Sequence, residues 1–177
     1  FSNFSQDFRR YRPDYENTYY INRDMGGGII LDALSHHLDL MIYFFGNIKK
    51  IKSLSKNIEI KNSDCEDFAI LNLSFLNRDI EGLVIGNQFQ KPNTDFIEIT
   101  GTKKSIKYDR TLNRLSISKG DGWTHKKIDG DWNYFLEEQI KNFIKMLRGK
   151  KFEGTSLREA LNNLETIEQK EEIWKKG

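Results

Sequence analysis

The chain has 177 residues, which suits one domain with a sizeable core better than two very small domains. Hydrophobic residues make up 37% of it and charged residues 31%, so the composition indicates a soluble globular protein and excludes a disordered one. The net charge is only +2, with basic and acidic residues evenly mixed, which argues against a nucleic-acid partner.

Cysteine usage and hydropathy predict the compartment. Cys65 is the single cysteine, so it cannot form an internal disulfide; this fits a cytoplasmic location, and we expect it to pack as a small hydrophobic residue. No run approaches the roughly 20 apolar residues that span a bilayer, and no signal peptide opens the chain, so no membrane partner is expected. The chain begins at Phe1 rather than Met, which suggests a fragment of a longer protein.

The central feature is a run of three glycines, residues 26–28, which opens into a predicted helix over 29–45. At about 100° per residue, one arc of this helix holds polar side chains and the remainder is apolar. The polar side chains are Asp32, Ser35, His36, Asp39 and Tyr43. This arc lacks the Lys, Glu and Gln of an ordinary solvated face, so it predicts the wall of a cleft. His37 projects from the apolar side and is expected to pack there, and Tyr43 is expected to have a buried hydroxyl.

The segment 1–23 is rich in aromatic residues and arginine and has no regular period. We expect an extended lead-in with one short strand. Tyr15, Tyr19 and Arg23 lie closest to the glycines, and such side chains can stack on a sugar or bind an anionic group. An irregular segment draped over the core explains these three residues equally well.

The middle of the chain reads as strands separated by short turns. The predicted strands are 48–60, 67–75, 80–89, 96–100, 105–108, 115–118 and 123–128. Short connections between successive strands indicate antiparallel neighbours and a meander-like sheet. Several strands are apolar on both faces, so one face is expected to be covered by helices and the other by a second domain or a partner subunit.

Two amphipathic helices are predicted to close the chain. The first covers 132–147 and is ended by Gly149. The second begins at Ser156, with Glu159 at the capping-box spacing, and its apolar stripe extends to Trp174. We expect both helices to pack on the sheet. The fold class is therefore α+β, with an open, mostly antiparallel sheet and helices packed on one face.

Two motifs resemble the glucose-fructose oxidoreductase / inositol dehydrogenase (Gfo/Idh/MocA) family. The glycine run and helix follow the pattern GGG-x-x-x-D-x-x-x-H-x-x-D, and residues 96–105 (FIEITGTKKS) look like the family's E-x-x-G-T-x-G-x hairpin. The closing helices fit as well. The resemblance covers almost the whole chain, 1–177, but only as the single C-terminal α+β domain of that family.

The resemblance implies a site and partners. Asp32 and His36 would lie opposite the nicotinamide of NAD or NADP, where they would orient a sugar hydroxyl and assist its proton transfer. Asp39 would bind substrate, although hydrogen bonding to the backbone near the glycine turn is an equal alternative. The open face of the sheet would mediate homo-oligomerisation.

The differences from the family pattern limit this chain. It has no G-x-G-x-x-G after a strand and no E-K-P motif, so the N-terminal Rossmann domain is absent and the chain alone is expected to bind no NAD(P) and to be inactive. The lead-in resembles a subgroup associated with surface-sugar biosynthesis. A sugar or nucleotide-sugar substrate is therefore expected rather than an inositol.

Two other hypotheses remain open at this point. The spacing of Asp32, His36 and Asp39 is compatible with a metal site, but a polar stripe without metal is favoured because no further Cys or His lies near them. A non-catalytic carbohydrate-binding or dimerisation module is the alternative function.

Overall fold

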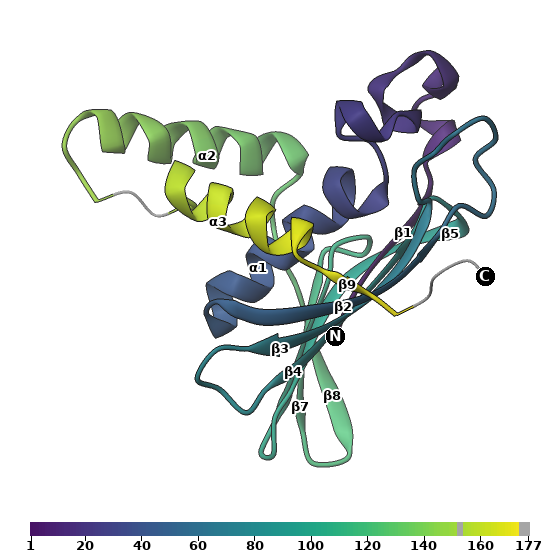
Figure 1. Ribbon diagram of the computed structural model, residues 1–177. Coiled ribbons are helices and arrows are strands. Elements are labelled where there is room, and N and C mark those ends of the chain that lie inside the picture. The colour runs from purple at the N-terminus through teal and green to yellow at the C-terminus, as the bar shows by residue number, and fades with distance from the viewer. Residues whose placement is uncertain (152–153, 174–177) are drawn as a thin grey trace.

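The computed structural model describes residues 1–151 and 154–173. Within them, a nine-stranded sheet carries three α-helices on one side, which confirms the α+β fold class (Figure 1). The strands are β1 (Ser2–Asp7), β2 (Ile48–Lys56), β3 (Phe68–Phe75), β4 (Glu81–Asn87), β5 (Phe89–Thr100), β6 (Ser105–Asp109), β7 (Arg114–Lys119), β8 (Gly122–Lys127) and β9 (Glu171–Glu172).

The sheet order is β8-β7-β6-β5-β1-β4-β3-β2-β9. β2 to β4 and β5 to β8 form the two antiparallel meanders that the short turns predict. β4 and β5 are not neighbours, however, because β1 lies between them, parallel to β4 and antiparallel to β5. The expectation that successive strands are neighbours is therefore wrong for β4 and β5, since the start of the lead-in supplies the strand between them.

The rest of the lead-in folds into four 3₁₀ turns, η1 (Phe8–Arg10), η2 (Tyr15–Asn17), η3 (Tyr19–Ile21) and η4 (Arg23–Met25). Phe8 and Tyr20 stack with their ring centroids 4.3 Å apart, and with Ile60 they form a small second core. This core holds the turns against the loop that follows β2.

The predicted central helix is confirmed, with a π-helical first turn (η5, Ile30–Leu34) followed by α1 (Ser35–Phe45). Its apolar side faces the main core: Leu34, Leu38 and Met41 are at most 1% exposed and belong to one cluster with residues of β3 and β4, including Leu71 and Val84. The packing of this helix is what fixes the direction of its polar arc.

By length and composition alone, the helical stretch Arg23–Phe45 could cross a membrane, with 23 residues and a mean hydropathy of 1.2 in its most apolar window. The expectation that no segment reaches this length is therefore wrong. A long, apolar sequence is also typical of a helix in the core of a protein. α1 packs against the sheet in the main core, as such a helix does.

The two closing helices are α2 (Trp132–Leu147) and α3 (Leu157–Glu168). The capping box at Ser156 is confirmed, and α3 buries Ile167 in the main core. Its predicted continuation is wrong, because the chain leaves the helix after Glu168 and forms β9 along the edge of β2; Trp174 lies outside the described residues.

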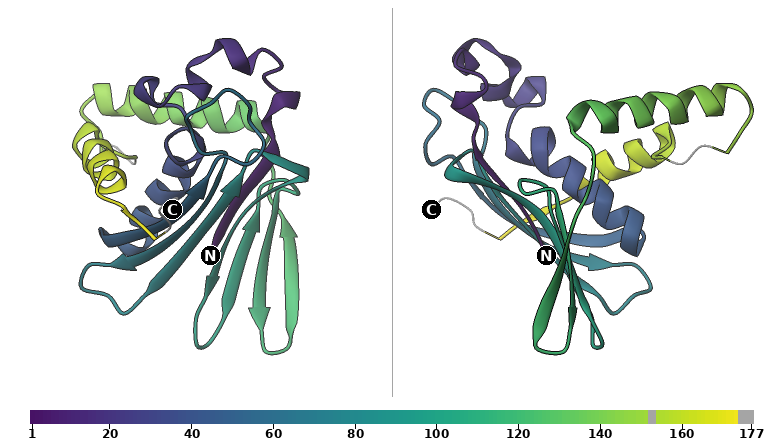
Figure 2. Two further views of the ribbon diagram at one scale, coloured as in Figure 1. Left: turned by 45° about the vertical axis from the view of Figure 1, so that its right-hand side comes forward. Right: turned by 180° about the vertical axis from the view of Figure 1, so that it is seen from behind.

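α2 does not pack on the sheet. It buries no residue, and Ile140 and Leu147 on its apolar side are 59% and 69% exposed. α1 and α3 already occupy the covered face of the sheet, and α2 lies beyond them (Figure 2). The expectation that both closing helices pack on the sheet is therefore wrong for α2.

The face of the sheet that carries no helix is partly apolar. Ile70 and Ile85 lie directly opposite each other on β3 and β4, and Phe68 and Leu83 flank them at the alternating positions that share this face. All four side chains are of intermediate exposure. The sequence expectation of strands with two apolar faces is therefore confirmed in this part of the sheet.

Candidate functional site

The glycine turn brings the lead-in onto the start of the central helix. A Cβ atom on Gly27 would lie 2.5 Å from the carbonyl oxygen of Tyr20, so only glycine allows this close approach. Gly28 has φ +96°, and its Cβ would lie 2.6 Å from Oε1 of Glu66. The turn therefore fixes where the helix begins.

Glu66 caps the start of this helix. Its Oε1 accepts a hydrogen bond from the backbone N–H of Ile30 at 3.2 Å, and its backbone carbonyl accepts one from Ile29 at 2.9 Å. A phosphate group at this helix start would meet a carboxylate that already holds the N–H donors. The glycine turn therefore does not fit the phosphates of a dinucleotide.

Arg23 takes part in the same cap. Its Nη2 is 3.1 Å from Oε2 of Glu66 and donates to the backbone carbonyl of Asp64 at 2.9 Å. Arg23, in η4, therefore binds the loop that carries Asp64 and Glu66. Tyr15 packs edge-on against Phe8 with ring centroids 5.2 Å apart. Neither Arg23 nor Tyr15 lines the cleft described below.

Asp32 is held by the lead-in. Its Oδ1 accepts a hydrogen bond from the hydroxyl of Tyr19 at 2.5 Å, and that hydroxyl in turn accepts one from Nη1 of Arg12 at 3.3 Å. The hydrogen bond to the Asp32 carboxylate raises the pKa of Tyr19 above its usual value. The structure therefore brings Tyr19, one of the predicted binding residues, directly to Asp32.

Asp32 and His36 line one cleft of about 770 Å³. They come from successive turns of the central helix, and His36 is exposed. Other elements complete the cleft with Tyr108, Arg110, Asn113, Asp131, Trp132 and Phe135. The structure thus places the two predicted catalytic residues side by side at an open, partly aromatic cleft.

Arg110, which follows β6, is a cleft residue that sequence reasoning missed. Its Nε is 3.2 Å from Oδ2 of Asp95, and its guanidinium lies over the ring of Trp132, with Cζ 5.8 Å from the centroid. The sequence offered one usable signal, because alternation along β6 places Tyr108 on the side that faces the helices. Arg110 lies two positions after Tyr108, so the same alternation points to it, although β6 itself ends at Asp109.

His37 lies beneath the cleft and is 3% exposed. Its Nδ1 is hydrogen-bonded to the hydroxyl of Ser2, and its Nε2 lies 3.6 Å from Oδ1 of Asp95. Burial, assisted by the positive charge of Arg110, lowers the pKa of His37 to about 4. The three residues are arranged in the order of a hydrolytic triad, but Ser2 is 0% exposed, so no substrate reaches it. The expected packing role of His37 is confirmed.

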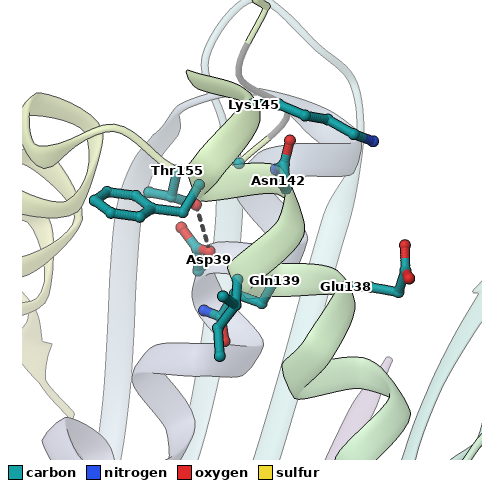
Figure 3. A pocket seen from close by; sticks show the side chains of 9 residues that line it. Asp39, Glu138, Gln139, Asn142, Lys145 and Thr155 are labelled. Carbon is teal, nitrogen blue, oxygen red and sulfur yellow. Dashed lines mark hydrogen bonds between the residues drawn. The ribbon is translucent and has the colours of Figure 1, made fainter. Parts of the chain in front are cut away.

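Asp39 lies at a different place from Asp32. Its carboxylate accepts a hydrogen bond from the hydroxyl of Thr155 at 2.8 Å (Figure 3) and another from the amide of Asn163 at 2.7 Å. It lines a separate cavity of about 840 Å³ beside α2. Asp32 and Asp39 are seven residues apart, which corresponds to about 10 Å along a helix. At the Asp32 end the polar arc faces the open cleft, and at the Asp39 end it faces α3.

Other polar residues of the arc also differ from a continuous cleft wall. Ser35 donates its hydroxyl to the backbone carbonyl of Leu31 at 2.6 Å. Tyr43 is 78% exposed, so the expectation of a buried hydroxyl is wrong. Among the described residues, no group of three or more His, Cys, Asp or Glu side chains could hold a metal ion.

Cys65 has the packing role expected of it. It is 4% exposed, and burial raises the pKa of its thiol to about 11.

Comparison with known protein families gives one match. The model of the Gfo/Idh/MocA family, described as the C-terminal alpha/beta domain of an oxidoreductase family, matches residues 4–170. The chain belongs to this family. The recognition made from the glycine run and its helix is therefore confirmed.

Solved structures of oxidoreductases share the fold at low sequence identity. A levoglucosan dehydrogenase in complex with NADH superposes with a TM-score of 0.79 at 13% identity, over 96% of this chain and 56% of that one. A UDP-N-acetylglucosamine 3-dehydrogenase from Acidithiobacillus ferrooxidans gives a TM-score of 0.74 at 14% identity, over 96% and 50%. The WlbA dehydrogenase from Bordetella pertussis, in complex with NADH and UDP-GlcNAcA, gives 0.69 at 21% identity, over 95% and 51%.

The chain spans about half the length of these structures. No curated protein sequence matches it. The structural likeness therefore establishes the fold of a C-terminal Gfo/Idh/MocA domain.

Proposed function

We propose that this chain is the substrate-binding and oligomerisation domain of an NAD(P)-dependent oxidoreductase that acts on a hydroxyl of a sugar or nucleotide sugar. The observation that carries the proposal is the cleft in which Asp32, hydrogen-bonded by Tyr19, lies one helical turn before His36. The sugar and nucleotide-sugar dehydrogenases that share the fold support this substrate class.

The two side chains suit the proton half of such a reaction. An imidazole can take up a hydroxyl proton near neutral pH, and His36 is exposed to the cleft where a sugar would lie. One oxygen of Asp32 accepts from Tyr19, and the other can accept from a neighbouring sugar hydroxyl. Asp32 would thus orient the ring while His36 holds the proton.

The cofactor would be held elsewhere. Because Glu66 occupies the helix start at the glycine turn, this chain does not fit the phosphates of NAD or NADP. A separate Rossmann domain would bind the dinucleotide, whose nicotinamide supplies the hydride acceptor. The exposed apolar side of α2 supports the existence of a further packing partner, since patches of this kind mark interfaces.

The helix-free face of the sheet is the surface that we propose for homo-oligomerisation. Its half-buried row of Phe68, Ile70, Leu83 and Ile85 provides the apolar contact. Light scattering should give at least twice the monomer mass for the chain, and Ile85→Lys should return it to the monomer. A wild-type monomer at high concentration would contradict this part of the proposal.

The cleft proposal is tested by NMR titration of the chain with glucose and UDP-glucose. The ring signals of His36 should shift on addition of a sugar, whereas those of His125, on β8 and outside the cleft, should not. Asp32→Asn should weaken the response. If no sugar shifts the His36 signals, the substrate-binding role is wrong.

A non-catalytic carbohydrate-binding or dimerisation module is the second candidate. The capped glycine turn favours it, because this chain offers no seat there for cofactor phosphates. The two candidates differ in the behaviour of a longer protein that includes this chain. Sugar binding without reduction of NAD or NADP would favour the module.

A further inference from the structure

The cleft contains a cationic and aromatic pair that the proton chemistry does not use. Building on the proposed function, we propose that Arg110 and Trp132 form an anion-binding subsite, which takes a carboxylate or phosphate group carried by the sugar substrate. Asp32 and His36 would then hold the sugar ring in the same cleft. Arg110 would make the site select acidic sugars or sugar phosphates over neutral sugars.

The support for an anion is local to one cationic side chain of the cleft. Arg110 is the only Lys or Arg among the described residues that line it. The two carboxylates in the lining already have donors, since Asp32 accepts from Tyr19 and Asp131 accepts from the backbone N–H of Tyr134 at 2.9 Å. These donors are neutral, so both carboxylates keep their charge, and the attraction for an anion comes from Arg110 alone.

The contacts of Arg110 leave the two terminal nitrogens of its guanidinium, Nη1 and Nη2, available to a ligand. The ion pair with Asp95 involves Nε, and the contact with Trp132 involves the flat face of the guanidinium. Among the described residues, no side-chain hydrogen bond engages Nη1 or Nη2, and the side chain is 42% exposed. Two parallel N–H donors of this kind match the two oxygens of a carboxylate or phosphate.

Asp95 acts as the positioning residue. Its side chain is only 13% exposed, and its Oδ1 lies 3.6 Å from Nε2 of His37, which is itself fixed by Ser2. The Oδ1–Nε2 separation is beyond hydrogen-bond distance, and Oδ1 is buried without a hydrogen-bond partner among the described residues, so burial between β5 and α1 rather than a hydrogen bond restricts the carboxylate. A fixed guanidinium loses less conformational entropy when it binds a ligand than a freely moving one.

The size of the cleft suits a sugar with an anionic substituent. A volume of about 770 Å³ is within the usual range of small-molecule sites. Trp132 is 64% exposed, so its indole can also stack on a sugar ring or a base. The shared chemistry is an anionic oxygen pair, and its source is either an acidic sugar or a phosphorylated one.

Calorimetric titration of the chain with glucose, glucuronate and glucose 1-phosphate tests the subsite. We expect at least one anionic sugar to bind about 10- to 100-fold more tightly than glucose, as charged hydrogen bonds of this type provide. Tighter binding of glucuronate than of glucose would identify the ligand group as a carboxylate, and tighter binding of glucose 1-phosphate would identify it as a phosphate. This increase in affinity over glucose is called the gain below. The gain should shrink as the salt concentration rises, whereas the affinity for glucose should not change.

Arg110→Gln should remove the gain and leave glucose affinity intact. Arg78→Gln, which makes the same charge change in the exposed turn between β3 and β4, is the matched control and should retain it. Asp95→Asn should reduce the gain without affecting glucose. If Arg110→Gln does not fold, Arg110→Lys keeps the charge but loses the fork, and it should retain only part of the gain.

Two results would overturn the subsite: equal affinity of the wild-type chain for all three sugars, or a gain that survives in Arg110→Gln. The signals of His36 separate this outcome from the fate of the proposed function. Glucose that shifts His36 without any gain for anions removes the subsite alone. An anion gain that depends on Arg110 while His36 stays unchanged removes the sugar-binding role of His36 alone.

Discussion

The central helix carries two aspartates and two histidines that have opposite environments. Asp32 and His36 line an open cleft, whereas Asp39 is bound by Thr155 and Asn163, and His37 is buried against Ser2 and Asp95. The residue types are the same in both pairs. The difference lies in what faces them: α3 covers Asp39, and β1 and β5 cover His37.

This comparison shows what a polar stripe on a helix can and cannot tell. A polar side chain on an apolar helix needs either water, a ligand or a protein partner. Asp39 and His37 have protein partners, which accounts for their presence. Asp32 interacts with the hydroxyls of Tyr19 and Tyr20 but also lines the cleft, and His36 faces the cleft, so these two are accessible to a ligand.

The largest effect is expected from a substitution that displaces the start of the central helix, because the helix positions both pairs of residues. Gly28→Ala places a Cβ at φ +96°, 2.6 Å from the carboxylate of Glu66, which holds the helix start. Backbone strain and the loss of the cap should together lower the free energy of unfolding by about 3–5 kcal/mol, as measured by urea denaturation. Gly26→Ala is the matched control, because it has φ +81° and open space around the Cβ. It should cost only about 1–2 kcal/mol, and equal losses would contradict a role for the Glu66 contact.

The buried histidine should make stability depend on pH. His37 has a pKa lowered from 6.5 to about 4, so the unfolded chain takes up a proton in this range before the native one does. The stability contributed by neutral His37 is therefore present above about pH 6.5 and is lost as the pH falls towards 4, by up to about 3 kcal/mol. Burial raises the pKa of Asp95, which acts in the opposite direction. Denaturation at several pH values should show a shallower slope for His37→Gln than for His36→Gln, and equal slopes would refute this assignment.

The two aspartates should respond differently to the same truncation. Asp39→Ala removes the acceptor of two hydrogen bonds, from Asn163 of α3 and from Thr155, which precedes α3, so we expect a loss of about 1–2 kcal/mol and unchanged sugar-induced shifts of His36. Asp32→Ala removes one partly exposed hydrogen bond, so it should cost less stability but weaken sugar binding. Reversal of the two patterns, in urea melts and NMR titrations, would place the substrate at Asp39.

The smallest expected effect concerns Tyr19. Its pKa is raised from 10.0 chiefly by its hydrogen bond to Asp32, so Asp32→Ala should lower the pKa of Tyr19 towards 10.0. Asp39→Ala should leave it unchanged, since Asp39 lies at a different cavity. NMR titration of ring-labelled tyrosine follows the signal, and a pKa of Tyr19 unaffected by Asp32→Ala would show that the contact is absent in solution.

The predictable part of this fold is the part encoded locally. Three features could be predicted from the sequence: the succession of strands along the chain, the capping box at Ser156 and the polar arc from Asp32. Each depends on residues a few positions apart. The placement of β1 in the centre of the sheet was not, since its pairing with Val84 and Ile97 joins distant segments. For the same reason the site was predicted only in part: Asp32 and His36 were named, and Arg110 was not.

The sequence by itself therefore determined the family, the main elements and the helix that carries the candidate site. The tertiary structure alone decided that Asp39 is hydrogen-bonded by Asn163 of α3, that α2 keeps its apolar side exposed, and that Arg110 reaches the cleft. The physical reason is that periodicity reports which side chains share a face of an element. What lies opposite that face depends on contacts such as Ser2 to His37, which are separated by 35 positions in the chain.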